Sequence, residues 1–462
     1  MNIQRKLKEL GFSCVPASFY DQIRYWKSWY DGKVKDFHNY SFYNGIESID
    51  CERYSVGMGK KVCEDWANLL LNEKVAITLE GEKEQEFVDS VLKRNNFEVK
   101  GNEQQERKAW SGTTAIVPYI ERMVVDAESG TVQNGGEIKL NYCTALSIFP
   151  LNWENGTITE CAFSREWAEN GRTYTYIQIH RLENGVYVIE NRAFDGSKEI
   201  PIYMAPGYKN TPEFINTGSE KPQFVIDRLN IANPDEDNPM GIAVFANSID
   251  QLEAVDISYD GYVNEFVLGK KRIIVKPEAR KDVDGRPVLD KRETVYYVLP
   301  EDGTNGNIIE EIDMTLRTAE FNAGMQDMLN VLSSKCGFGE NHYKYDNGNI
   351  STATQVVSEN STLFRTIKKH ELILKSVLID LCRIILRMGN SYMGMGLNED
   401  VEISIDFDDS IIEDEESDFN RDARLLQMGI MNDWEFRAKW MNEDPETAKK
   451  SLPKMESLVV DE

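Results

Sequence analysis

Large apolar residues recur every three or four positions between Met240 and Phe266, a period typical of an amphipathic helix. The pattern predicts one helix of about 27 residues with a narrow apolar seam to bury. Asp256 stands at the one place along the seam where an apolar residue is missing. The predicted seam residues are Ile242, Phe245, Ile249, Leu252, Tyr259, Val263 and Phe266.

A row of acids runs along nearly the same helix, at Asp250, Glu253, Asp256 and Asp260. Like charges three or four residues apart on a helix repel each other by a few tenths of a kcal/mol, about 0.2–0.5 per pair. The row therefore adds nothing to the stability of an isolated helix. Two interpretations stay open from the residues alone: a solvated face, or a face where negative charge is needed.

Two further helices are predicted after this one. The first covers residues 315–335, with Phe321, Met325, Met328 and Leu332 on one face. The second begins at Ser351 or Thr352, and we expect Gly389-Asn390 to end it near Met388. Its start is rich in Ser, Thr and Asn, which predicts a bend near 358–361. Its seam consists of Leu363, Ile367, His370, Leu374, Val377, Leu381, Ile384 and Met388.

The first half of the chain divides into a helical and a β-rich part. Residues 16–71 have helical spacing and an aromatic cluster, and residues 113–230 alternate between apolar and polar side chains. Asn-Gly and Asp-Gly pairs separate the alternating stretches, as in β-hairpins. These patterns together predict an α+β fold.

The charge of the chain excludes several classes of protein. Its 462 residues carry a formal net charge of −26, which argues against a general basic nucleic-acid binder and against a protein lying on anionic lipid. The seven cysteines are scattered without a C-x-x-C pair, which predicts unpaired thiols in a reducing compartment. No apolar run approaches 18 residues and the N-terminus lacks an apolar signal region, so we expect neither a membrane span nor a signal peptide.

One segment departs from the acidic balance. Residues 269–292 carry nine basic side chains against four acidic ones. Basic residues here either dock an acidic partner or protect strand edges from stray pairing. The basic residues are Lys270, Lys271, Arg272, Lys276, Arg280, Lys281, Arg286, Lys291 and Arg292.

The sequence offers no catalytic constellation. It has no phosphate-binding P-loop, no G-x-S-x-G or H-E-x-x-H motif, and no Cys/His cluster with metal-ligand spacing. The four histidines are far apart, and His370 lies in a helical seam, where we expect a core or interface histidine. The acidic run at 406–418 lacks the glycine of a calcium loop. We therefore predict no enzyme, no metal and no cofactor.

Several blocks of sequence resemble one family over nearly the whole chain. They are WKSWYDG (26–32), MGKKVCEDWANLLLNEKV (58–75), NPMGIAVFANSIDQLEAVDISYDGYVNEFVLGKKRI (238–273), the block KCGF…DNGN…TATQVVSENSTLFRTI (335–367) and FDDSIIEDEES (407–417). Their order is similar to that in portal proteins of tailed bacteriophages of the siphophage type, in the branch that infects Gram-positive hosts.

The resemblance implies a portal-type fold with a β-rich wing, two stem helices, a small αβ clip, a long bent helix and a short helical C-terminal tail. The implied parts are the wing (1–239, with 390–412 returning to it), the first stem helix (240–268), the clip (269–314), the second stem helix (315–336), the tunnel loop (337–351), the long bent helix (352–389) and an acidic tail or short crown (413–462).

The resemblance also implies a function. Portal proteins form rings, usually dodecamers, at one capsid vertex, and double-stranded DNA passes through the ring during packaging and ejection. The acidic row would then line the channel, and the apolar seam would pack against neighbouring copies. The tunnel loop would present Asn341, His342, Tyr343, Lys344, Tyr345 and Asp346.

The implied partners are further copies of the chain, DNA bound without sequence specificity, the terminase large subunit, the major capsid and scaffold proteins, and a head-completion or adaptor protein. The basic segment would dock the terminase motor and the head-completion proteins. The expected location is the virion, after assembly from the host cytoplasm, with no membrane partner. Two alternatives remain: a minor capsid or scaffold-type adaptor without a channel, and a metal-dependent nuclease.

Overall fold

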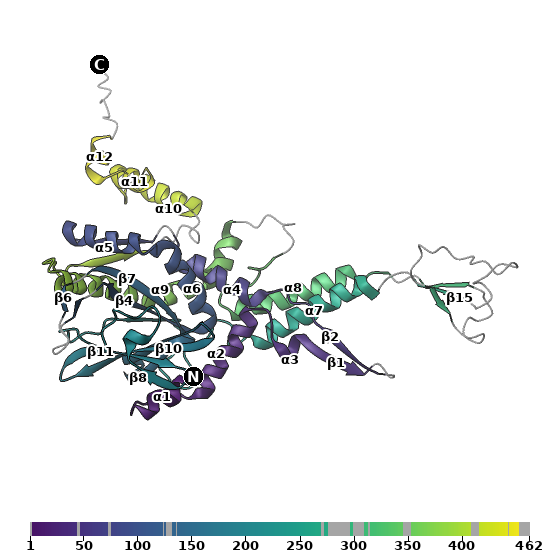
Figure 1. Cartoon of the computed structure of the whole chain (residues 1–462). Helices are drawn as coiled ribbons and strands as arrows, with labels where there is room; N and C mark the ends of the chain where they lie inside the picture. The colour runs from purple at the N-terminus through teal and green to yellow at the C-terminus, as the bar shows by residue number, and fades with distance from the viewer. Residues whose placement is uncertain are drawn as a thin grey trace, which may run out of the picture.

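The computed structural model describes a mixed α and β chain, which confirms the α+β prediction. The described residues are 2–43, 47–72, 75–122, 124–125, 132–134, 136–268, 272–275, 296–298, 309–312, 315–344, 353–407, 415–441 and 443–451. Figure 1 shows a body of helices and sheets from which a two-helix rod projects, with a small sheet beyond the end of the rod.

The helices of the N-terminal part pack around aromatic side chains. The described helices are α1 (Ile3–Glu9), α2 (Ala17–Tyr30), α3 (Lys35–His38), α4 (Met58–Leu70), α5 (Glu82–Arg94) and α6 (Phe97–Ser111). Pro16 caps the start of α2, and Tyr20, Trp26 and Trp29 on α2 are buried in the main core. Trp66 on α4 is completely buried.

The β-rich part contains two main antiparallel sheets and a two-stranded antiparallel pair, β5 (Val124–Val125) with β6 (Val132–Asn134). The larger contains β8 (Ile148–Glu154), β9 (Thr157–Glu169), β10 (Arg172–Glu183), β11 (Val186–Asp195), β12 (Lys198–Ile200) and β13 (Phe214–Asn216). The smaller has the order β14 (Val225–Arg228), β4 (Thr113–Glu121), β7 (Glu137–Thr144). Asn155 and Asn184, each followed by glycine, have positive φ at the hairpin turns, as the Asn-Gly pairs predict.

The rod consists of α7 (Ile249–Leu268) and α8 (Thr318–Lys335), which lie side by side (Figure 1). Three short strands follow the end of α7: β15 (Arg272–Val275), β16 (Tyr296–Val298) and β17 (Ile309–Ile312). In this sheet β15 pairs in parallel with β16 and antiparallel with β17.

The long helix α9 (Ala353–Met393) returns from the rod into the body. All eight residues of its predicted seam, from Leu363 to Met388, are buried. After α9, β18 (Ile403–Asp406) pairs with β3 (Ala76–Leu79), so the chain returns to its N-terminal part. The tail contains α10 (Glu415–Gln427), α11 (Asp433–Trp440) and α12 (Pro445–Lys450).

The prediction that α7 begins at Met240 is wrong, because its first turn starts at Ile249. Residues 240–248 are not helical and pack against the end of α6, where the Val244 N–H donates to Ala109 O at 2.8 Å. A Cβ on Gly112 would lie 2.4 Å from Gly241 O, so two glycines permit this close approach. Ile242 and Phe245 are therefore part of the body core rather than of a rod seam.

The predicted end of the long helix is also wrong. Gly389 lies inside α9, which continues to Met393, and Gly394 follows with a φ of +62°. A Cβ on Gly389 would lie 2.7 Å from the ring of Phe87 on α5. Gly389 thus permits the close packing of α9 against α5, and Gly394 adopts the left-handed conformation that ends the helix.

Two expectations drawn from composition can be compared with the described residues. All seven cysteines are free, as the scattered spacing predicts. Among the helices of the described ranges, none is long and apolar enough to cross a membrane.

Candidate functional site

The acidic row of α7 does not form one open face. Asp250 is exposed and Glu253 is half-buried, but Asp256 and Asp260 are only 4% and 8% exposed. The expectation that all four carboxylates are available to line a channel is therefore wrong for Asp256 and Asp260. Residues of the same chain cover these two.

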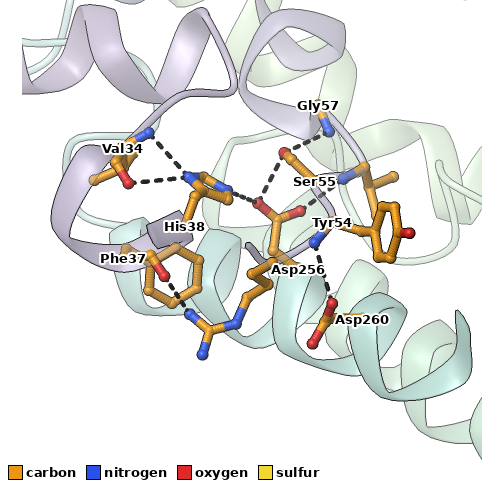
Figure 2. Close-up of polar contacts among 10 residues, drawn as sticks. Val34, Phe37, His38, Tyr54, Ser55, Gly57, Asp256 and Asp260 are labelled. Atoms are coloured by element: carbon orange, nitrogen blue, oxygen red, sulfur yellow. Dashed lines mark hydrogen bonds and ion pairs between the residues drawn. The ribbon is translucent and has the colours of Figure 1, made fainter. Parts of the chain in front are cut away.

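Asp256 accepts three hydrogen bonds from residues that flank the hairpin of β1 (Asn39–Tyr43) and β2 (Ser48–Glu52) (Figure 2). His38 Nε2 lies 3.0 Å from Oδ2, the Ser55 hydroxyl donates to Oδ2 at 2.9 Å, and the Val56 N–H donates to Oδ1 at 2.8 Å. Nε2 is the donor, because a carboxylate only accepts. On the other side of the ring, Nδ1 lies 2.9 Å from Val34 N and 3.2 Å from Val34 O. We call residues 34–38 and 53–57 the clamp.

Asp260 extends the same contact one turn further along α7. Its Oδ1 accepts from the Tyr54 N–H at 3.1 Å, and its Oδ2 accepts from the Asn264 amide at 3.1 Å. A buried carboxylate is tolerated only when its oxygens are hydrogen-bonded. The clamp meets this need for Asp256, and the clamp together with Asn264 meets it for Asp260. Asp256 therefore has its ionic partner, His38, within its own chain.

The opposite side of α7 holds α8. Arg317 donates to Glu265 at 3.0 and 2.8 Å, and this hydrogen bonding lowers the pKa of the Glu265 carboxyl. Gly261 lets the ring of Phe321 approach closely, since a Cβ there would lie 3.2 Å from that ring. The clamp and α8 therefore cover different sides of α7 and hold it in a fixed orientation.

The rod nevertheless exposes large apolar side chains. Only Leu252 of the seven predicted seam residues is buried on the rod itself, while Ile249, Tyr259 and Val263 are half-buried. The exposed apolar residues of the rod and of the non-helical segment just before α8 are Ile257, Phe266, Val267, Leu316, Met328 and Val331. Grouped exposed apolar side chains indicate an interaction surface.

The loop after α8 is anchored to α4 at its beginning. Buried Phe338 stacks on His342, with ring centroids 4.5 Å apart, and also contacts Trp66 at 5.0 Å. His342 Nε2 lies 3.7 Å from Asp65 Oδ2. Burial would raise the pKa of the Asp65 carboxyl, but hydrogen bonds from neighbours that include His342 outweigh it and lower the pKa.

The other predicted loop residues differ in backbone conformation and in burial. Asn341 has a left-handed φ of 67°, Tyr343 is half-buried, and Lys344 is exposed at the end of the described loop. The backbone oxygen of Tyr343 accepts from the Gln326 amide at 2.8 Å. The remaining two predicted residues, Tyr345 and Asp346, lie outside the described residues.

His370 is a core histidine, as predicted. Its Nδ1 accepts from the Asn230 N–H at 3.1 Å, its ring packs edge-on against Trp66, and burial lowers its pKa to about 3. Trp66 also donates from Nε1 to Cys336 O at 3.1 Å. Trp66 thus joins the end of α8, the following loop and α9, a role that its place on an apolar helical face could not reveal.

The predicted basic docking residues fall mostly outside the described residues. Arg272 begins β15, and nothing is described of Lys270, Lys271, Lys276, Arg280, Lys281 or Arg286. Within the described ranges, no group of three or more His, Cys, Asp or Glu side chains could hold a metal ion.

Comparison with models of protein families gives a match over most of the chain. The family model described as "Phage portal protein, SPP1 Gp6-like" matches residues 17–456. No curated protein matches the chain. The matched range covers the helical part, both sheets, the rod, α9 and the tail.

Proposed function

Because the chain belongs to the SPP1 Gp6-like family of phage portal proteins, we propose that it assembles into a closed ring at one capsid vertex. The ring is expected to be a dodecamer whose channel carries double-stranded DNA during packaging and ejection. Its location is then the virion, after assembly from the host cytoplasm. The chain itself has a structural rather than a catalytic role in this proposal, in keeping with its family.

The rod is the single observation that supports this proposal most directly. Two helices project from the body and expose apolar side chains to water, among them Ile257, Met328 and Val331. A contact between unlike faces of identical copies closes into a ring when the rotation between them permits. Packing rods side by side around an axis would bury these side chains and leave a channel between them.

We assign the channel wall to Asp250 and Glu253. DNA carries one phosphate charge per about 1.7 Å of its axis, so basic walls would bind it and acidic walls would let it slide. Asp256 and Asp260 are left out of this wall because the clamp buries them, and their role is to fix the orientation of α7. The net charge of −26 is consistent with a ring that does not bind DNA tightly.

We propose that the basic segment 269–292 docks the terminase large subunit and, later, a head-completion or adaptor protein. The body would contact the major capsid and scaffold proteins. Residues 341–346 would approach the DNA at the inner end of the rod. The anchoring of His342 and Phe338 on α4 would hold the base of this loop in place.

Charge reversal tests the assigned wall. We expect the double variant Asp250→Lys/Glu253→Lys to assemble normally but to package less DNA into empty capsids, because lysines would hold the passing phosphates. The matched control is Glu82→Lys/Glu86→Lys, which reverses two exposed acids on α5 in the body. Unchanged packaging by the rod variant would show that Asp250 and Glu253 do not face the DNA.

A further inference from the structure

The β1–β2 hairpin is an isolated two-stranded sheet. β1 (Asn39–Tyr43) pairs with β2 (Ser48–Glu52), and no other described strand joins them. None of the ten strand residues is buried. A lone hairpin of this size is marginally stable in water, so it needs a surface to pack against. We call these two strands the arm.

The base of the arm is firmly held. The Arg53 N–H donates to His38 O at 2.7 Å, and its guanidinium donates to Phe37 O at 2.6 Å. The same guanidinium lies over the rings of Phe37 and Tyr40, 4.2 and 4.7 Å from their centroids. The clamp then fixes this base to Asp256 of α7. The base of the arm thus fixes the direction in which the arm projects, although none of the strand residues is buried.

The exposed part of the arm is aromatic and acidic. Phe42 is 48% exposed and Tyr43 is 68% exposed. Residues 39–52 include Glu47, Asp50 and Glu52 and contain no basic residue. A partner surface for the arm should therefore combine apolar area with positive charge.

The far end of the rod has this combination. Phe266 and Val267 at the end of α7 are exposed, as is Leu316 before α8. The side chain of Arg317, which follows Leu316 and pairs with Glu265, is 64% exposed. In the sequence, Lys270, Lys271 and Arg272 begin two residues after the end of α7.

The arm does not cover this surface in its own chain, since Phe42 and Phe266 both remain exposed. Figure 1 shows the arm running beside α7 and pointing away from the body, in the same direction as the rod. In a ring, the arm of one copy would therefore run alongside the rod of the next copy.

We propose that the arm of each subunit packs across the far end of the rod of a neighbouring copy. Phe42 and Tyr43 cover Phe266, Val267 and Leu316, and the acids of the arm face Arg317. The clamp fixes the direction of the arm, and so the spacing of adjacent rods. This inference rests on the ring assembly proposed above.

Photo-crosslinking tests the contact in the full-length chain. Phe42 is replaced by p-benzoylphenylalanine, and the variant is assembled together with unsubstituted chain made with heavy isotopes. We expect crosslinked peptides that join position 42 of the light chain to residues 262–268 or 315–321 of the heavy chain. The control places the same group at Tyr203, an exposed aromatic of the body, and should give no crosslink to those peptides.

The outcomes separate the two proposals. Assembled rings whose position 42 crosslinks elsewhere, or only within its own chain, would overturn the arm contact and leave the ring intact. Absence of any assembly by the unsubstituted chain would overturn the ring and the arm contact together.

A second variant measures the strength of the contact. We expect Phe42→Ser/Tyr43→Ser to raise the concentration for half-assembly about tenfold, with unchanged unfolding of the unassembled chain. A tenfold change corresponds to about 1.4 kcal/mol. An unchanged assembly concentration would contradict the proposal.

Discussion

His38 and Asp256, 218 positions apart in the sequence, form a buried hydrogen-bonded pair with 3.0 Å between Nε2 and Oδ2. Each side chain is at most 6% exposed. The pair joins the base of the arm to the middle of the rod helix α7. It also explains why an acid stands in the apolar seam: its partner comes from a distant segment of the same chain.

Removing this acid should destabilise the fold. We expect Asp256→Ala to lower the free energy of unfolding by about 2–4 kcal/mol, because buried His38 and half-buried Ser55 and Val56 each lose their acceptor. The control Asp250→Ala removes an exposed acid of the same helix. It should change the free energy of unfolding by less than about 0.5 kcal/mol. Denaturant unfolding followed by tryptophan fluorescence measures both. Equal effects would show that the clamp contributes nothing to stability.

A second prediction concerns acid sensitivity. His180 lies between the rings of Phe163 and Phe224, neither of its ring nitrogens has a hydrogen-bond partner, and burial lowers its pKa to about 3. A histidine in the unfolded chain has a pKa of about 6.5. Below that pH the unfolded state binds a proton at His180, whereas the folded state does not. Stability should therefore fall as the pH decreases from about 6.5 toward 3.

The variant His180→Phe checks this prediction, because it keeps an aromatic ring in the same place and removes the proton uptake. The variant should lose about 3 kcal/mol less stability than the natural chain between pH 6.5 and pH 4, at 1.36 kcal/mol per pKa unit. Unfolding is measured at each pH. Parallel pH profiles of the two proteins would contradict the assignment.

The body contains a buried ion pair that the sequence did not reveal. Lys108 Nζ on α6 lies 2.9 and 3.0 Å from the carboxylate oxygens of Asp227 on β14, and the Gln105 amide donates to the same carboxylate at 2.8 Å. We expect Lys108→Ala to cost about 3–5 kcal/mol, since it leaves a charge buried without its partner. The double variant Lys108→Met/Asp227→Leu should lose less stability than the sum of the losses of Lys108→Met and Asp227→Leu made singly. Additive costs in a double-mutant cycle would show that the two groups are not coupled.

Two helical glycines should respond oppositely to alanine. Gly389→Ala places a Cβ 2.7 Å from the Phe87 ring, so we expect a loss of about 1–3 kcal/mol from overpacking. Gly324→Ala in α8 meets no atom within 4 Å, and we expect a gain of about 0.5–1 kcal/mol from helix propensity. Thermal unfolding of the unassembled chains measures both. A gain at 389 would show that α9 and α5 can separate without cost.

The elements that follow from local spacing were predicted well. The buried seam of α9, the second rod helix and the Asn-Gly turns all agree with the structure. In each case the signal lies within a few residues of the chain. The free cysteines likewise agree with their scattered spacing.

The predictions that were wrong depended on distant contacts. Ile242 and Phe245 continue the helical period only because the body core requires apolar residues there as well. The burial of Asp256 and Asp260 depends on residues about 200 positions earlier in the chain. A local pattern cannot distinguish an exposed acid from one that meets such a partner.

Electron microscopy of the purified full-length chain in negative stain is the most direct test of the central claim. We predict rings with a central hole wide enough for a DNA duplex, with the rods arranged around that hole. Compact monomers at high protein concentration would contradict the account, because the exposed apolar side chains of the rod would then have no partner copy.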